Sequence, residues 1–176
     1  DAETAGLLVR SRANVNATNR YGVPPLFIAC TNGNATVVRL LLDAGANANA
    51  SLPGGETVLM TAARVGNLEA VKALLARGAN PNAQERRDQT ALMWAAAEGH
   101  ATVVRALIEA GSTTNATLAS GFTPLFFAVR EGHIDVVRVL LEAGVNVNEV
   151  LGAKGGPVAG RYDPIGKGTS PLMMAV

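Results

Sequence analysis

The chain has 176 residues, of which 48% are hydrophobic and 4% are aromatic, and its formal net charge is +1. Because 15 basic residues are balanced by 14 acidic ones, the composition gives no argument for a nucleic-acid partner. No stretch approaches the about 18 apolar residues of a membrane span, so we expect no membrane partner. The sequence does not name the compartment, and a soluble, cytoplasmic chain is only our working expectation. Twelve of the basic residues are arginine, which favours a GC-rich bacterial gene.

Three sets of residues recur along the chain at a step of 33 residues. The first set consists of leucines, at Leu26, Leu59, Leu92 and Leu125. The second and third sets consist of glycines, at Gly33, Gly66, Gly99 and Gly132 and at Gly45, Gly78, Gly111 and Gly144. A period of this length is typical of a solenoid, in which each unit packs only on its neighbours.

Residues 1–18 precede the first complete unit. Counted by one period, Leu8 matches Leu41 and Asn16 matches Asn49. We therefore predict that this stretch contains the second helix and the exit loop of a partial unit. We interpret the chain as part of a longer array.

Four full units follow, and each is predicted to contain two helices joined by a tight turn and closed by a loop. Their predicted boundaries are 19–51, 52–84, 85–117 and 118–150. The first helix begins after a capping residue, as at Thr123, which is followed by Pro124. It is short and alanine-rich, and a glycine of the second set ends it. The second helix buries apolar pairs such as Leu40 and Leu41.

Charged residues follow the outer side of the predicted second helices. Three arginines lie four residues before an acid, in the pairs Arg39 and Asp43, Arg105 and Glu109, and Arg138 and Glu142. We predict an ion pair within each helix, worth about 0.2–0.5 kcal/mol. The exit loops carry alternating asparagines, such as Asn47 and Asn49, which we expect to hydrogen-bond the turning backbone.

The period is interrupted once, near the end of the chain. The distance from Leu125 to Leu172 is 47 residues, which is 33 plus 14. We assign the excess to a long inserted hairpin or loop at 151–167, followed by the start of a further unit at 168–176. Loops of this length are usually functional or disordered, and Arg161 and Tyr162 are the candidates in it to contact a partner.

The best-preserved unit resembles the ankyrin repeat. The residues that carry the resemblance are Gly121-Phe122-Thr123-Pro124-Leu125, Ala128, Gly132-His133, Val136 to Gly144, Asn146 and Asn148. The resemblance covers nearly the whole chain. It implies an all-α ankyrin-repeat α-solenoid, built as one domain from helix-turn-helix-β-hairpin/loop units, with a partial repeat at each end.

This sequence departs from the family at one position in every repeat. The residue after the motif leucine is usually histidine in the family, whereas here it is Phe27, Met60, Met93, Phe126 or Met173. We therefore expect apolar packing between neighbouring repeats where the family has a polar network.

The resemblance also implies a non-catalytic module that binds a partner protein through its concave face and hairpin tips. The candidate residues on that surface are Arg20, Tyr21, Val23, Arg64, Arg86, Arg87, Gln89, Trp94, Phe122, Phe127 and Arg130. Aromatic residues and arginine dominate binding hot spots. We expect exposure of Tyr21, Arg86, Arg87 and Phe122, whereas Trp94 and Phe127 either lie partly exposed on the concave side or pack between layers.

No pattern in the chain indicates a cofactor, a metal, a small-molecule substrate or catalysis. His100 and His133 lie one period apart, directly after helix-ending glycines, and are predicted to be capping residues rather than metal ligands. Cys30 is predicted to be a small buried apolar residue. Two alternatives to a binding module are a recruiting or regulatory segment of a larger enzyme and a structural spacer.

Overall fold

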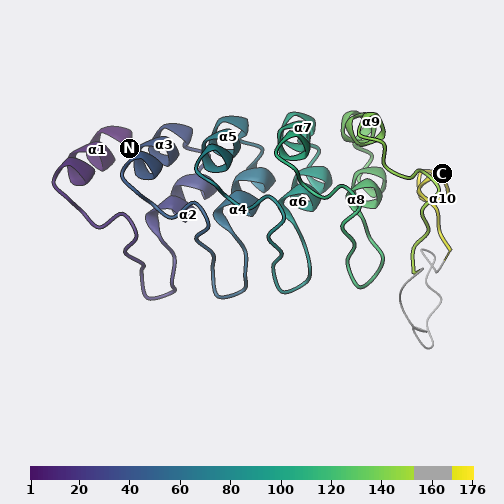
Figure 1. The fold of residues 1–176 in the computed structure, drawn as a ribbon, viewed down its shortest axis with the longest axis horizontal. Helices are drawn as coiled ribbons and strands as arrows, with labels where there is room; N and C mark the ends of the chain where they lie inside the picture. Colours follow the sequence, from purple (N-terminus) through teal and green to yellow (C-terminus); the bar gives the residue numbers. More distant parts are fainter. Residues whose placement is uncertain (153–167) are drawn as a thin grey trace.

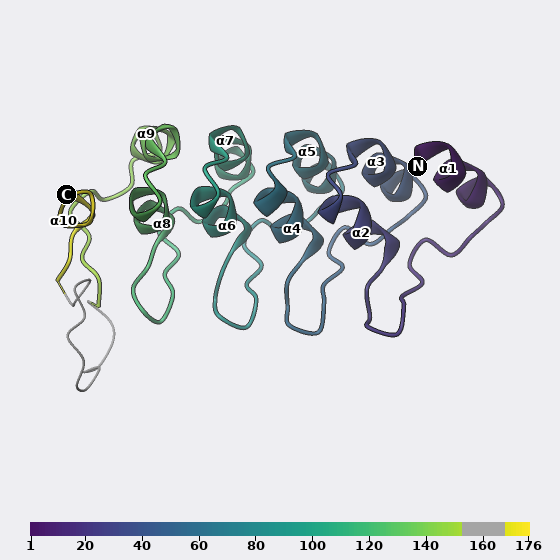
Figure 2. The same cartoon turned by 180° about the vertical axis from the view of Figure 1, so that it is seen from behind.

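The computed structural model describes residues 1–152 and 168–176, and within them the helices form two layers (Figures 1 and 2). The first layer contains α1 (Ala2–Arg10), α3 (Ala35–Asp43), α5 (Leu68–Ala76), α7 (Ala101–Glu109) and α9 (Ile134–Glu142). The second contains α2 (Pro25–Thr31), α4 (Val58–Val65), α6 (Ala91–Ala97), α8 (Pro124–Arg130) and α10 (Pro171–Met174). The array is an all-helical solenoid, because each element packs on its immediate neighbours.

Loops project from the second layer on the side away from the first layer (Figure 1). We call them the first finger (residues 17–24), the second finger (50–57), the third finger (83–90) and the fourth finger (116–123). In the second finger, Ser51 and Thr57 form an isolated antiparallel bridge. Each finger leads directly into a helix of the second layer.

Hydroxyl side chains begin most helices of the second layer, as the sequence predicts. The Thr57, Thr90, Thr123 and Ser170 hydroxyls each accept a hydrogen bond from the backbone N–H three residues on. Such a bond satisfies one of the donors that a helix leaves free at its start. Pro24 takes this position before α2 and makes no side-chain cap.

The core is a continuous strip between the two layers and between successive helix pairs. The four motif leucines of α2, α4, α6 and α8 are buried. The side chains that replace the family histidine in these helices are buried too, at Phe27, Met60, Met93 and Phe126. The expected apolar packing is therefore confirmed there.

The turn between α4 and α5 shows why a glycine is needed at that position. Gly66 ends α4 with φ +78°, a left-handed conformation that residues with a Cβ adopt only at a cost. In addition, a Cβ at Gly66 would lie 2.5 Å from the imidazole ring of His100. The glycine thus serves both its own turn and the packing of the next helix pair.

Asparagines connect successive exit loops in a ladder. The Asn49 side chain donates to the Gly78 carbonyl at 2.9 Å and accepts from the Asn80 backbone N–H at 2.8 Å. The Asn47 side chain holds the Asn49 backbone at 2.9 Å. Asn16 and Asn82 make the same contacts to their following loops. The predicted bonding to the turning backbone is confirmed, and it also joins neighbouring repeats.

The predicted ion pairs within the second helices are wrong. The Arg39 side chain instead lies 3.1 Å from Glu69 on the next helix. Likewise, Arg105 pairs with Glu142 at 2.9 Å. Asp43, the predicted partner of Arg39, pairs with Arg77. Because α3, α5, α7 and α9 lie side by side, a long arginine reaches the neighbouring helix as easily as the next turn of its own (Figure 2).

The predicted insertion at 151–167 lies mostly outside the described residues. Leu151 is buried, its N–H donates to the Thr169 carbonyl, and its carbonyl accepts from the Gly168 N–H. These two bonds join the chain before and after residues 153–167. The boundaries assigned to this insertion and to the repeats remain predictions.

Candidate functional site

We call the surface made by the four fingers and by the adjoining side of α2, α4, α6 and α8 the finger face. The sequence analysis placed its candidate partner-binding residues on these elements. Within the described residues the candidates fall into two groups, namely the finger tips and the bases of the fingers beside the helices. Side chains at the tips are exposed to solvent, whereas several side chains at the bases already contact other residues of the chain.

The tips present the most exposed candidates. Tyr21 is 64% exposed, and the side chains of Arg20, Arg86 and Arg87 are exposed as well. The guanidinium of Arg20 lies over the Tyr21 ring, 4.7 Å from its centroid. The exposure expected for Tyr21, Arg86 and Arg87 is therefore confirmed, while their role in binding stays a prediction.

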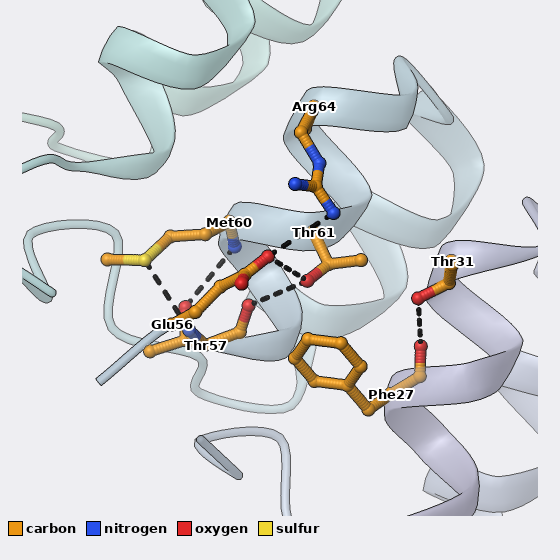
Figure 3. Close-up of polar contacts among 7 residues, drawn as sticks. All are labelled: Phe27, Thr31, Glu56, Thr57, Met60, Thr61 and Arg64. Carbon is orange, nitrogen blue, oxygen red and sulfur yellow. Dashed lines mark hydrogen bonds and ion pairs between the residues drawn. The ribbon is translucent and has the colours of Figure 1, made fainter. Parts of the chain in front are cut away.

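A polar cluster occupies the base of the second finger (Figure 3). The Glu56 carboxylate accepts a hydrogen bond from the Thr61 hydroxyl at 3.1 Å and pairs with Arg64 at 3.4 Å. The Arg64 guanidinium also lies 5.1 Å from the centroid of the Trp94 ring on the next helix. Arg64 therefore has partners of its own before any protein binds.

The sequence analysis missed the pairing of Glu56 with Thr61. Thr61 is buried, and the equivalent positions of the neighbouring helices hold the apolar residues Ile28, Trp94 and Phe127. A hydroxyl at a position that is otherwise apolar needs a hydrogen-bond partner when it is buried. That substitution was the available signal for a polar cluster.

Aromatic side chains pack together at the base of the fourth finger. Phe122 lies 5.3 Å from Phe127 in an edge-to-face arrangement and 5.7 Å from Phe126, between ring centroids. Arg130 lies 5.3 Å from the centroids of both Phe122 and Phe127. The exposure predicted for Phe122 is wrong, because this ring is half-buried by the other two.

The two possibilities left open for Trp94 and Phe127 are resolved differently. Phe127 is buried and packs between the layers. Trp94 is half-buried, and its indole N–H is covered without a hydrogen-bond partner in the described part of the chain. Part of the Trp94 side chain is therefore accessible to solvent, whereas Phe127 belongs to the core beneath the finger face.

The remaining candidates are half-buried or lie beyond the described residues. Val23 and Gln89 are half-buried at the point where a finger meets its helix. Arg161 and Tyr162 belong to residues 153–167, outside the described ranges, so their predicted contact with a partner stays a prediction.

The histidines connect repeats through their side chains. His100 and His133 occupy the N-cap positions of α7 and α9, as predicted, although neither side chain makes a capping bond. Instead, Nε2 of His100 lies 3.0 Å from the Arg64 carbonyl, and Nε2 of His133 lies 3.0 Å from the Ala97 carbonyl. Because a carbonyl only accepts, each Nε2 carries the proton and donates.

The titratable groups with shifted pKa values are explained by burial. Burial raises the pKa of Cys30 to about 12, so this thiol stays protonated near neutral pH and serves as the predicted buried residue. Burial also raises the pKa of Glu149, although a hydrogen bond from the Thr123 hydroxyl opposes that rise. Among residues 1–152 and 168–176, no three potential metal-binding side chains come together.

A family model for ankyrin repeats matches residues 1–85 and 80–150 of the chain. Together with the helical architecture, this match shows that the chain belongs to the ankyrin-repeat family. No curated protein matches the chain. The helices described here are all too short to cross a membrane.

Ankyrin repeats generally serve as protein–protein interaction modules and are typically non-catalytic. That general role agrees with a surface whose exposed candidates are arginine and tyrosine, the residue types that often anchor protein interfaces.

Proposed function

We propose that this chain is a non-catalytic protein-binding module whose partner contacts the finger face. One observation carries the proposal. The first and third fingers project on the same side of the array (Figure 1), and the residues exposed at their tips are Arg20, Tyr21, Arg86 and Arg87. These residue types are enriched in binding hot spots, and side chains that already stand in solvent lose little packing when a partner covers them.

The bases of the fingers support this surface in a second way. The Arg64–Trp94 and Arg130–Phe122 stacks fix long side chains against the helices. Side chains that are already ordered lose less conformational entropy on binding. The proposed interface therefore has exposed tips for contact and a firm base beneath them.

Affinity capture from an extract of the source organism tests the proposal. The bait is the parent chain, beside an Arg86→Ala, Arg87→Ala variant and a control Lys72→Ala, Arg138→Ala variant. Each variant removes two positive charges, but the control residues lie exposed on the outer helices α5 and α9. We expect a protein that the parent and the control retain and the tip variant loses, with circular dichroism unchanged in all three.

Equal retention by all three baits would contradict the finger face as the binding surface. Capture of nothing by any bait would favour the structural-spacer alternative. The alternative of a recruiting segment within a larger enzyme requires a catalytic domain in the same polypeptide, which the complete gene sequence would reveal.

A further inference from the structure

The four finger tips share one backbone structure, and they differ in the side chains that it displays. Each tip is a four-residue turn, at 19–22, 52–55, 85–88 and 118–121, closed by a backbone hydrogen bond of 2.8–2.9 Å from its last residue to its first. The central residue pairs of these turns are Arg20 and Tyr21, Pro53 and Gly54, Arg86 and Arg87, and Ala119 and Ser120. Charged tips therefore alternate with small, neutral tips.

The two charged tips are held by a side chain at the start of the turn. In the third finger, the Glu85 carboxylate accepts from the backbone N–H groups of Arg87, at 2.8 Å, and Gln89, at 3.3 Å. In the first finger, the Asn19 side chain does the same for Tyr21, at 2.9 Å, and Val23. The turn is thus set before any partner arrives, which lowers the entropic cost of binding.

Neighbouring tips also touch, so the first three fingers form a continuous edge. The Arg86 N–H donates to the Gly54 carbonyl at 3.1 Å, and this bond joins the third tip to the second. A Cβ placed on Gly22 would meet the Pro53 ring at 3.8 Å, so the first tip lies against the second. We call residues 19–22, 52–55 and 85–88 the tip edge.

The arginines of the tip edge are exposed and have no ion-pair partner among the described residues. None of Arg20, Arg86 and Arg87 forms an ion pair with residues 1–152 or 168–176, in contrast to Arg64 and Arg130 at the finger bases. Two carboxylates flank the third tip. That of Glu85 is turned towards backbone N–H groups, and that of Asp88 forms no ion pair with the described residues. Three exposed guanidinium groups are therefore available for an external anion.

We propose that the tip edge binds an extended, acidic segment of the partner protein, which crosses from the third finger to the first. One carboxylate cluster of that segment pairs with Arg86 and Arg87, and a second pairs with Arg20 beside the Tyr21 ring. Between them the segment passes over Pro53 and Gly54, where a Cβ on Gly54 would meet nothing within 4 Å. The inference rests on the proposed function and adds the chemistry of the partner.

The geometry sets the spacing of the two acidic clusters. Adjacent packed helices lie about 8–10 Å apart, so tips two repeats apart are separated by about 16–20 Å. An extended chain advances about 3.3 Å per residue, which places the clusters about 5–6 residues apart.

A nucleic acid is disfavoured as the ligand of the tip edge. The third tip is flanked by the carboxylates of Glu85 and Asp88, and the net charge of the chain is only +1, so the dense negative charge of a nucleic acid would not be well matched.

Selection from a displayed library of random peptides tests this inference, followed by fluorescence-anisotropy titration of the selected peptides. The three proteins are the parent, an Arg86→Glu, Arg87→Glu variant and a control Lys72→Glu, Arg138→Glu variant with the same change in net charge. We expect selected peptides with two acidic clusters about 5–6 residues apart. The tip variant should weaken their affinity about tenfold or more, and the control should change it by less than about threefold.

The possible failures are distinguishable. Neutral or basic peptides that still depend on Arg86 and Arg87 would overturn the acidic chemistry and leave the proposed function intact. Peptides that bind the tip variant as tightly as the parent, or a selection that yields no peptide, would count against both. An equal loss in the control variant would overturn the tip edge, because it would show a response to net charge alone.

Discussion

Helices α6 and α10 begin with the same motif and differ sharply in burial. In α6, which follows the cap Thr90, Leu92 and Met93 are 0% and 1% exposed. In α10, which follows the cap Ser170, Leu172 and Met173 are 75% and 65% exposed. Both helices begin after a hydroxyl cap, and the two side chains are of the same types, leucine and methionine.

The difference lies in the neighbours of the two helices. Helix α6 packs against α4, α7 and α8, whereas α10 packs against α8. In a solenoid, a motif residue becomes core only when another unit covers it. Comparison of a covered and an uncovered copy of one position therefore separates what a residue contributes locally from what its neighbours add.

The largest expected difference comes from the motif leucines themselves. Leu92→Ala should lower the free energy of unfolding by about 2–5 kcal/mol, because it leaves a cavity in a packed strip. Leu172→Ala should change it by less than about 0.5 kcal/mol, because that side chain is exposed. Urea unfolding followed by circular dichroism measures both, and equal losses would show that Leu172 is covered in solution.

A second comparison uses the glycines between paired helices. Gly66 and Gly132 have similar φ angles, +78° and +74°, so an alanine costs about 1–2 kcal/mol at each. Only at Gly66 would the new Cβ meet the His100 ring and disrupt its bond to the Arg64 carbonyl, whereas at Gly132 nothing described lies within 4 Å. Gly66→Ala should thus be worse than Gly132→Ala by about 0.5–1.5 kcal/mol in thermal unfolding.

A smaller difference between the two glycine variants would mean that His100 moves aside without cost. The double variant Gly66→Ala, His100→Ala provides the control. It should recover the part of the loss that the steric clash causes.

The asparagine ladder lacks one asparagine, in the loop that follows α7. Thr113 stands where Asn14, Asn47, Asn80 and Asn146 stand in the other loops. Among the described residues, no side-chain hydrogen bond joins Asn115 to the loop after α9. Thr113→Asn should restore the side-chain acceptor for the Asn115 backbone and stabilise the chain by about 0.5–1.5 kcal/mol.

The reverse change, Asn80→Thr, removes an acceptor that holds the Asn82 backbone at 2.9 Å. It should destabilise the chain by a similar amount in the same assay. If Asn80→Thr destabilises and Thr113→Asn has no effect, the ladder ends at that loop for a reason other than Thr113.

The ion pairs between first-layer helices are expected to contribute less to the free energy of unfolding. Arg105 and Glu142 are both 52% exposed, and exposed pairs contribute about 0.2–1 kcal/mol. Arg105→Ala should cost an amount in that range at low salt and less at high salt. Arg138→Ala is the control, since Arg138 makes no ion pair with described residues, and an equal cost for both would show that the pair adds nothing.

The smallest effect concerns pH. Glu149 stands where the preceding loops have Ala50, Ala83 and Ala116, and its pKa is raised in the folded chain by burial. Because the folded chain holds the proton of Glu149 more tightly than the unfolded chain does, this group stabilises the fold at low pH. The stabilisation is fully present below the pKa that Glu149 has in the unfolded chain, and it is lost as pH rises through the pKa of the folded chain. Glu149→Ala should remove this loss, as unfolding curves on both sides of that window would show, and an unchanged pH profile would contradict it.

Several features of the fold follow from the sequence because they are local. A threonine that accepts a bond three residues on, a glycine in a left-handed turn and a short alanine-rich helix are each specified within one repeat. The exposure of Tyr21, Arg86 and Arg87 was predictable for the same reason, because they occupy the centre of turns that project from the array. Their binding role stays a prediction.

Features that depend on a neighbouring repeat were not predictable in the same way. Sequence spacing favoured Asp43 as the partner of Arg39, but the adjacent helix offered Glu69 at an equal reach. Phe122 shows a second kind of failure, within one repeat. Its motif position predicted exposure, whereas the rings of Phe126 and Phe127 in the same repeat half-bury it.

The sequence by itself determined the repeat period, the helical solenoid and the identity of the residues at each tip. These follow from short-range hydrogen bonding and from the recurrence of one pattern. Only the tertiary structure decided which side chains are free to meet a partner. Arg64 and Arg130 are engaged at the finger bases, whereas Arg20, Arg86 and Arg87 are left without a carboxylate among the described residues. The physical reason is that the partner of a charged side chain depends on distances in the folded array, within one repeat for Arg64 and Arg130 and between repeats for Arg39.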